Sequence, residues 1–482
     1  MNRRMILSLL CIIMRLEAVF MLPPLVISIH QQAHDAVTAF LLTIVVMLFS
    51  SMTTYLLPPS NKIIYAREGL LTVAMAWIMV SIFGAFPFFL SGEIPNFVDC
   101  LFETVSGFTT TGASILSDVE SLSMGLLYWR SFTHWLGGMG VLVFLLAIAP
   151  LAKGKGSFMY LLRAESPGPE VDKLVPKLHK SAALLYAIYV VMTLIQIFLL
   201  LAGGMPLFDS VTTAFGTAGT GGFSIKNDSM IGYTLYQQAV VTIFMALFGV
   251  NFNIYYLLLM KKFRKAFLSQ ELRAYFGIML GAIFLMTWNV LPMFGGNLGQ
   301  ALHHVSFQVS SVMTTTGFCT QDFDLWPEFS RTILVILMIV GACAGSTGGG
   351  IKIARVVLIF KSAVSTFRRM LRPRSVSVIQ IDGHTVEKDT INSMYSFLII
   401  YSVVAIFSIL LISLDNLSFE TNVTAVLACL NNIGPGLDVV GPVGNYSSFS
   451  NFSKLVLSFT MLVGRLEIFP MLILFLPSAW KR

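Results

Sequence analysis

Two identical runs, Thr-Thr-Thr-Gly, lie at 109–112 and 314–317, each directly after a short apolar stretch. Two related glycine-containing runs are GTAGTGGFS at 216–224 and NNIGPGLD at 431–438. Thr is a mediocre helix former and Gly a poor one, so each run should end a helix. Carbonyl oxygens released from a helix, and nearby hydroxyls, can replace the water shell of a monovalent cation. The four runs therefore predict a cation site built mainly from backbone.

The composition indicates what kind of chain positions these runs. Of 482 residues, 56% are hydrophobic and 11% are charged, and the mean hydropathy is +0.80. A soluble globule carries about 25% charged residues, so we expect an all-α polytopic membrane protein. The apolar run after the N-terminal MNRR lacks a small-residue cleavage site, and we interpret it as a retained first span.

Segments long enough to cross hydrocarbon need about 20 apolar residues. Such segments lie near 6–29, 37–57, 69–91, 127–151, 180–204, 236–260, 273–294, 330–361, 391–414 and 453–477. Shorter apolar segments lie between them, near 97–111, 206–219, 299–315 and 418–432. These are too short to span and too apolar for surface loops, which predicts that they are re-entrant.

Positive charge predicts the orientation. If the short segments dip in and return on one side, the basic clusters all fall on one face. These clusters are MNRR, Lys62 with Arg67, 153–180, 261–265, 367–374 and the final WKR. Cytoplasmic loops are rich in Lys and Arg, so both termini should be cytoplasmic. The net charge of +7 is then a topology signal, and no nucleic-acid partner is expected.

After two N-terminal spans, the chain repeats one pattern of span, re-entrant segment and span. The predicted boundaries are 1–68 for the first two helices, then 69–152, 180–261, 272–362 and 390–478 for the four repeats. Self-similarity at a long period indicates one structural unit copied along the chain. Four such units can close around an axis, where non-helical backbone is tolerated because it lines a cavity.

At these motifs the sequence resembles the Trk/Ktr/HKT superfamily of potassium transport proteins, most closely the bacterial TrkH/TrkG type of Trk potassium-uptake subunit. The resemblance covers the whole chain and implies four pseudo-repeats around a central pore, and a homodimer in the bacterial inner membrane. In plant relatives, serine at the first filter glycine accompanies sodium transport. Gly112 stands at that place, which implies potassium selectivity. The implied potassium-binding filter residues are Thr110, Thr111, Gly112, Gly219, Thr220, Gly221, Thr315, Thr316, Gly317, Asn432, Ile433 and Gly434.

The stretch GACAGSTGGGIK, from Gly341 to Lys352, lies within the long segment 330–361. Its glycines disfavour a helix by roughly 1 kcal/mol each, so the helix should break there. We expect an intramembrane gating loop at 341–350, which the resemblance also implies; tight packing of small residues is the alternative. The expected gating residues are Gly345, Gly348, Gly349, Gly350, Lys352 and Arg465. Arg465, buried in the last span, should repel cations or hold this loop.

Other ionisable groups leave their roles open. Glu103, Asp209 and Glu420, in the re-entrant segments, either draw cations to the pore mouth or brace the helices. Arg15 and Glu17 in the first span should form a structural ion pair. No lone intramembrane carboxylate stands out as a proton carrier.

The sequence holds no enzyme constellation, so we expect a transporter and not an enzyme. The histidines His134, His179, His303, His304 and His384 lack metal-ligand spacing with acidic residues.

The resemblance implies a cytoplasmic partner, a TrkA-type regulatory ring that binds NAD and ATP-type ligands. The basic face could dock this ring or contact anionic membrane lipid. Nucleotide binding belongs to the partner, and potassium is the transported ion. The main rival is a proton- or sodium-coupled secondary transporter with broken helices in two inverted halves. Passive channel and proton-coupled symport both remain open within the favoured interpretation.

Overall fold

Helices dominate the computed structural model, which describes residues 2–52, 65–138, 140, 178–372 and 378–480. In these residues the strands are β1 (Gln380–Ile381) and β2 (His384–Thr385), which form one antiparallel pair. Six of the described helices are long and apolar enough to cross a membrane, or seven if one bent pair counts as a span. The predicted all-α membrane fold is confirmed.

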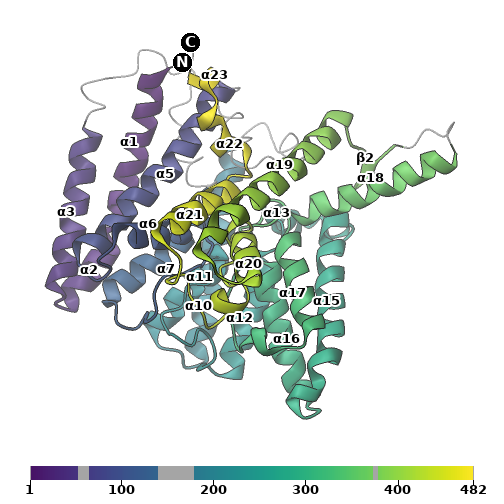
Figure 1. Cartoon of the computed structure of the whole chain (residues 1–482), viewed down its shortest axis with the longest axis horizontal. Coiled ribbons are helices and arrows are strands. Elements are labelled where there is room, and N and C mark those ends of the chain that lie inside the picture. Colours follow the sequence, from purple (N-terminus) through teal and green to yellow (C-terminus); the bar gives the residue numbers. More distant parts are fainter. Residues whose placement is uncertain (1, 53–64, 139, 141–177, 373–377, 481–482) are drawn as a thin grey trace.

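Within the described residues, three helices precede the repeats and lie along one side of the molecule (Figure 1). They are α1 (Arg3–Phe20), α2 (Leu22–His30) and α3 (His34–Ser51). The break between α1 and α2 falls at Met21, just before two prolines that fit the first turn of a helix. α1 and α3 pack against α5 (Ala66–Leu90), and α2 packs against α7 (Met124–Gly138).

Four units of three helices follow; we call the middle helix of each unit its short helix, because it falls in a short apolar segment of the sequence, and the two flanking helices its long helices. The first contains α5, α6 (Phe97–Phe108) and α7. The others contain α10 (Leu178–Ala202), α11 (Leu207–Gly219) and α12 (Leu235–Phe248); α15 (Gln270–Val290), α16 (Leu298–Met313) and α17 (Glu328–Val340); and α19 (Lys388–Ile412), α20 (Phe419–Leu430) and α21 (Asn451–Arg465). Each short helix packs between the two long helices of its own unit.

The units also close on one another. Each short helix packs against the second long helix of the preceding unit: α11 on α7, α16 on α12, α20 on α17, and α6 on α21. The last of these contacts joins the fourth unit to the first. The four short helices therefore stand inside a closed ring of long helices.

In the second, third and fourth units the last helix ends early. α12 bends by 89° into α13 (Phe252–Leu259), and α17 is separated from α18 (Ile353–Leu371) by residues 341–352. α21 ends at Arg465, where Glu467 and Ile468 have positive φ, and short α22 (Phe469–Leu472) follows. The predicted break in 330–361 is confirmed. The predicted spanning segments at 236–260 and 453–477 are also interrupted, the first by the bend between α12 and α13 and the second by left-handed backbone at Glu467 and Ile468.

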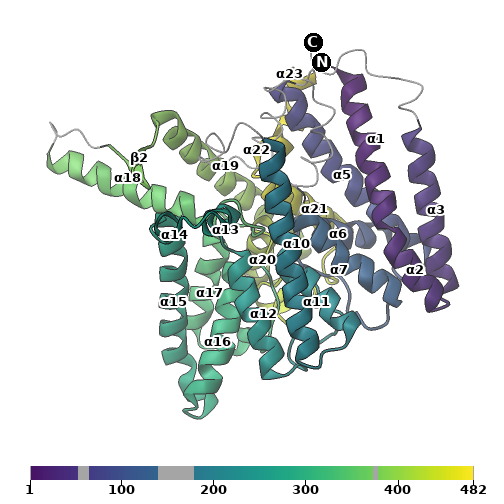
Figure 2. The ribbon, with the colours of Figure 1, turned by 180° about the vertical axis from the view of Figure 1, so that it is seen from behind.

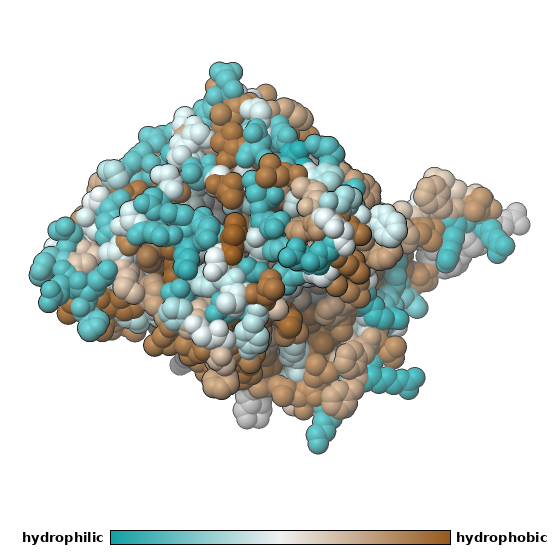
Figure 3. Space-filling model, turned by 90° about the horizontal axis from the view of Figure 1, so that it is seen from below, coloured by the Kyte–Doolittle hydropathy of each residue, from teal (hydrophilic) through white to brown (hydrophobic). Residues whose placement is uncertain are grey.

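The two termini lie at the same end of the molecule (Figures 1 and 2). α18 projects sideways from the rest of the molecule, and the β1–β2 hairpin precedes α19 (Figure 1). The remaining short elements are α14 (Phe263–Phe267), α23 (Pro477–Trp480), η2 (Leu291–Phe294), η3 (Phe323–Leu325), η4 (Ser413–Asp415), η5 (Asp438–Val440) and η6 (Ile473–Phe475). Seen from the opposite end, hydrophilic side chains spread over much of the face (Figure 3).

Candidate pore and its intramembrane loop

The four short helices end in one and the same backbone geometry. At the end of α6, Thr110 adopts φ 54°, and the N–H of Thr111 donates to the carbonyl of Ser106 at 2.8 Å. This is a Schellman cap, in which a left-handed residue closes the helix. The equivalent left-handed residues are Thr220 (φ 53°), Thr315 (φ 60°) and Asn432 (φ 55°). Left-handed backbone costs a β-branched residue about 1–2 kcal/mol, so three threonines are held there against their preference.

A glycine with positive φ lies two residues after each left-handed residue. These glycines are Gly112 (φ 79°), Gly222 (φ 73°), Gly317 (φ 88°) and Gly434 (φ 100°). We call the resulting stretches 110–112, 220–222, 315–317 and 432–434 the hinge segments. They contain all the predicted filter residues except Gly219, which is the last residue of α11.

The second unit differs by one residue from the sequence alignment. The predicted filter group Gly219, Thr220 and Gly221 puts Gly221 in the place that Gly112 has in the first unit, but the backbone puts Gly222 there. The shared Gly-Phe pair at 222–223 and 317–318 is the sequence signal that would have given this register. Gly221 therefore lies in the middle of its hinge segment, at the position equivalent to Thr111.

The hinge segments converge on one another. A Cβ built on Gly112 would lie 1.9 Å from the carbonyl oxygen of Gly221, so only glycine fits. A Cβ built on each of the other three glycines would also lie less than 3.0 Å from a carbonyl oxygen of the next unit. The pairs are Gly222 with Thr316, Gly317 with Ile433, and Gly434 with Thr111. The contacts run from each unit to the next and return to the first. Four backbone segments with close-packed carbonyl groups can replace the water around a monovalent cation.

A histidine supports the first two hinge segments. His134 on α7 lies between the carbonyl of Gly107, 2.8 Å from Nδ1, and the N–H of Phe223, 3.1 Å from Nε2. The Phe223 N–H is a donor, so Nε2 accepts, Nδ1 carries the proton, and the ring is neutral. From the sequence, His134 was expected only to lack metal-ligand spacing, and this supporting role was not predicted.

A buried ion pair lies behind the same two segments. Glu103 on α6 and Arg130 on α7 are 2.6 Å apart, with side-chain exposures of 0% and 3%. Glu103 also accepts from the Ser114 hydroxyl at 2.9 Å and the Ile115 N–H at 3.0 Å, while Arg130 donates to the Ser224 carbonyl at 2.7 Å. Of the two predicted roles for Glu103, its contacts match bracing. Arg130, a lone charge in an apolar span, was the overlooked sequence signal.

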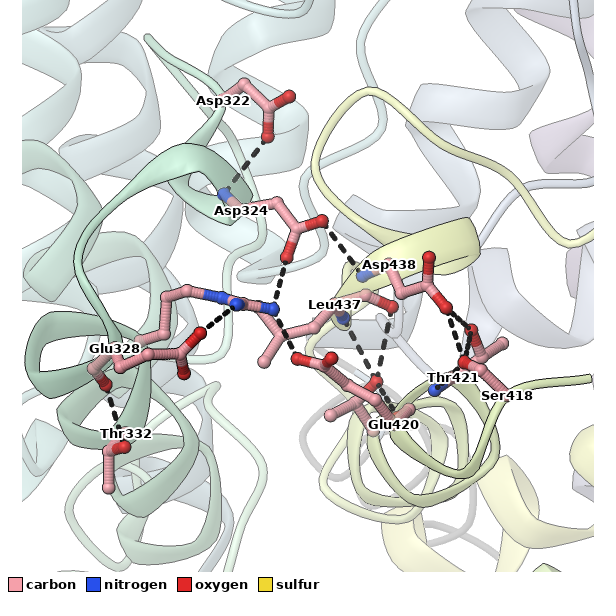
Figure 4. A network of polar contacts seen from close by, with 11 residues as sticks. Asp322, Asp324, Glu328, Thr332, Ser418, Glu420, Thr421, Leu437 and Asp438 are labelled. Carbon is pink, nitrogen blue, oxygen red and sulfur yellow. Dashed lines mark hydrogen bonds and ion pairs between the residues drawn. The ribbon is translucent and has the colours of Figure 1, made fainter.

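Ion pairs also join the third and fourth units at their outer edge (Figure 4). Arg331 on α17 contacts Asp324 at 3.0 Å, Glu328 at 2.7 Å, and Glu420 on α20. Asp324 in turn accepts from the N–H of Asp438 at 3.1 Å. Glu420 therefore also has a bracing contact, and Asp209 accepts a hydrogen bond from the Tyr233 hydroxyl at 2.9 Å.

Residues 341–352, which we call the glycine loop, lie directly against the hinge segments. The N–H of Gly349 donates to the Thr315 hydroxyl at 2.7 Å. A Cβ on Gly349 would collide with the carbonyl of Asn431, and one on Gly348 would lie 2.9 Å from the carbonyl of Thr314. Because this stretch is not helical, the alternative of tight helix packing is wrong.

Polar contacts hold the glycine loop from several sides. The N–H of Cys343 donates to Gly249 at 3.1 Å, and the Gly345 carbonyl accepts from Phe252 at 3.0 Å, both at the bend between α12 and α13. The Glu271 carboxylate accepts from the N–H of Ala344 at 2.6 Å. The bend in the second unit thus makes room for the loop of the third.

Two positively charged side chains donate hydrogen bonds to backbone carbonyls of the glycine loop. Arg465 donates from Nη1 to the Thr347 carbonyl at 2.9 Å and from Nη2 to the Gly137 carbonyl at 2.7 Å. Lys352 donates to the carbonyl of Gly348. Gly350 (φ 75°) packs against Gly341. The structure therefore brings the predicted gating residues together beside the third and fourth hinge segments.

Several basic clusters of the predicted inner face, including Lys62, Lys153, Lys155 and Arg374, lie outside the described residues. Two described clusters are exposed: Lys261, Lys262, Arg264 and Lys265 around α14, and Arg368, Arg369 and Arg372 at the end of α18.

Comparison with known proteins agrees with this architecture. Residues 36–481 match the family model TrkH, described as a cation transport protein. The chain is 32% identical to the Trk system potassium uptake protein TrkG of Escherichia coli K12, covering 97% of this chain and 96% of that one. It is 36% identical to the Trk system potassium uptake protein TrkH of Salmonella typhimurium, with 86% of each covered.

The crystal structure of the potassium transporter TrkH from Vibrio parahaemolyticus superposes with a TM-score of 0.88 at 28% identity, covering all of both chains. The resemblance inferred from the hinge motifs is confirmed. The chain belongs to the TrkH family of cation transport proteins.

Proposed function

We propose that this chain mediates potassium uptake through a pore whose selectivity filter is the ring of hinge segments. The observation that carries the proposal is the closed set of glycine-to-carbonyl contacts, which joins all four units in order. A ring of carbonyl oxygens held in place by the neighbouring backbone cannot easily contract around a smaller ion. The relatives with matching sequences are named as potassium uptake proteins.

We further propose that the glycine loop is the gate. It lies against Thr315 and Asn431 at the base of the ring and is bound by Arg465 and Lys352. These two positive side chains disfavour a cation at the same place, so a closed loop both fills the path and adds electrostatic repulsion. Opening requires that the loop leave its hydrogen bonds to the surrounding units.

The end that carries both termini is proposed to face the bacterial cytoplasm. Its exposed Lys and Arg side chains around α14 and α18 fit the rule for cytoplasmic loops. The relatives are named as parts of a Trk system, which supports a protein with further components. We propose that this face docks a TrkA-type ring that binds NAD and ATP-type ligands, and that the chain forms a homodimer.

The test is ion flux through the purified protein in liposomes. Rubidium uptake into potassium-loaded vesicles should exceed that of protein-free vesicles and be inhibited by external potassium but not by equal sodium. Repeating the assay with and without a pH gradient distinguishes passive conduction from proton coupling. Equal inhibition by sodium and potassium would reject the filter assignment, and uptake no faster than in protein-free vesicles would reject transport by this chain.

A further inference from the structure

A solitary carboxylate lies inside the first membrane-spanning segment. Glu17 on α1 is near the centre of the apolar stretch Arg3–His30 and is only 3% exposed. Within the described part of the chain, neither of its carboxylate oxygens has a hydrogen-bond partner. The predicted ion pair with Arg15 is wrong: residues two apart lie on different faces of a helix, and Arg15 donates to the hydroxyl and carbonyl of Ser51.

The carboxyl group of Glu17 is next to α6, the short helix of the first unit. At Gly84 on α5, an added Cβ would lie 3.3 Å from Oε1 of Glu17, 2.9 Å from the methyl group of Thr104 and 2.7 Å from the ring of Phe108. Thr104 and Phe108 belong to α6, and Phe108 is its last residue before the first hinge segment. The Glu17 carboxyl group and two side chains of α6 therefore all lie close to Gly84.

The other ionisable groups on the surrounding helices have contacts of their own. Asp99 pairs with Lys454, Glu103 with Arg130, and Glu68 accepts from the backbone of Asn2 and Tyr65. His134 is engaged by Gly107 and Phe223, Cys100 contacts the Ile94 carbonyl, and Arg67 donates to Ser478. The side chains of Arg3, Arg4, His30, His34 and Asp35 are exposed. Among the described residues, no ion pair or hydrogen bond gives Glu17 a counter-charge.

An ionised carboxylate in this place is disfavoured twice. A charge at the centre of a membrane helix costs about 3 kcal/mol even on insertion scales. The C-terminal end of α6 also carries partial negative charge, which repels a carboxylate near Phe108. Both penalties disappear when the carboxyl group is neutral.

We propose that Glu17 is a proton-binding site, and that its carboxyl group holds a proton while α6 is packed against α5. Release of this proton would place a negative charge beside the end of the first pore helix and loosen that packing. The site lies outside the ring of hinge segments and does not depend on which cation passes through it. Glu17 is thus an intramembrane carboxylate able to hold a proton, which was not predicted from the sequence.

Infrared spectroscopy of the full chain in liposomes at neutral pH tests the proposal. Wild type should show the carbonyl stretch of a protonated carboxylic acid, and the band should shift in heavy water and be absent in E17Q. The control E387Q removes an exposed carboxylate at the start of α19 and should retain the band. Coincident spectra of wild type and E17Q in this region would overturn the proposal.

Thermal unfolding gives a second readout that does not require transport. Glutamine resembles the neutral acid in shape and charge, so E17Q should unfold within a few degrees of wild type and of E387Q. A large loss of stability in E17Q with none in E387Q would show that the fold depends on an ionised Glu17, and would reject a bound proton.

Discussion

Replacement of Gly112 by serine is the sharpest perturbation that the structure offers. A side chain there meets two separate obstacles: φ of +79°, and a Gly221 carbonyl oxygen 1.9 Å from the new Cβ. Ordinary contact begins at 3.4 Å, so the carbonyl must retreat by 3.4 − 1.9 = 1.5 Å. A displacement of that size in one of four converging carbonyls should impair discrimination between potassium and sodium.

Gly204 provides a matched control for the backbone strain. It has the same φ of +79°, but a Cβ there meets nothing within 4 Å. G112S and G204S should therefore share a strain of about 1–2 kcal/mol, while only G112S displaces a carbonyl. The difference between the two variants isolates the contact in the ring.

The assay is rubidium uptake into liposomes with increasing external sodium, together with thermal unfolding of both variants. We expect sodium to compete at least tenfold better in G112S than in wild type, equivalent to about 1.4 kcal/mol of lost discrimination. G204S should keep wild-type selectivity. Folded G112S with unchanged sodium exclusion, or the same loss of selectivity in G204S, would refute the assignment of the ring as the filter.

Three further predictions follow from named contacts. R465A removes the charged hydrogen bonds to the Thr347 and Gly137 carbonyls, each worth about 1.5–3 kcal/mol. Rubidium influx measured without any regulator should therefore rise at least tenfold. The control R369A, which removes an exposed arginine, should leave the influx unchanged. E103Q leaves the buried Arg130 charge uncompensated, which should lower the free energy of unfolding by about 3–5 kcal/mol. E328Q should change the free energy of unfolding little, because the Glu328 side chain is 84% exposed. Equal melting temperatures of the two variants would contradict this prediction. Hydrogen bonds from the Ser418 and Thr421 hydroxyls lower the pKa of Asp438, so its contribution to stability is full at neutral pH and is lost as the pH falls through the folded-state pKa; acidification should lower the melting temperature of wild type more than that of D438N.

Much of the fold could be predicted because it depends on neighbouring residues. Apolar length separates spanning from re-entrant segments, and Thr-Gly runs end helices by their own conformational preferences. The glycine-rich break after Val340 follows from the same local rule. The bends at Gly249 and at Glu467–Ile468 were not predicted, because their backbone conformation depends on the glycine loop and neighbouring units packed against them.

By itself, the sequence determined the class of the protein, the fourfold repeat and the positions of three of the four hinge glycines. Each of these features depends on residues that are adjacent in the chain. Only the tertiary structure decided which residues meet across units: Gly222 as the second hinge glycine, Arg130 as the partner of Glu103, and Thr347 as the group bound by Arg465. It also separated Glu17 from Arg15. The physical reason is that a helix cap is chosen by a few adjacent residues, whereas the partner of a buried charge is chosen by segments far apart in the chain that pack side by side.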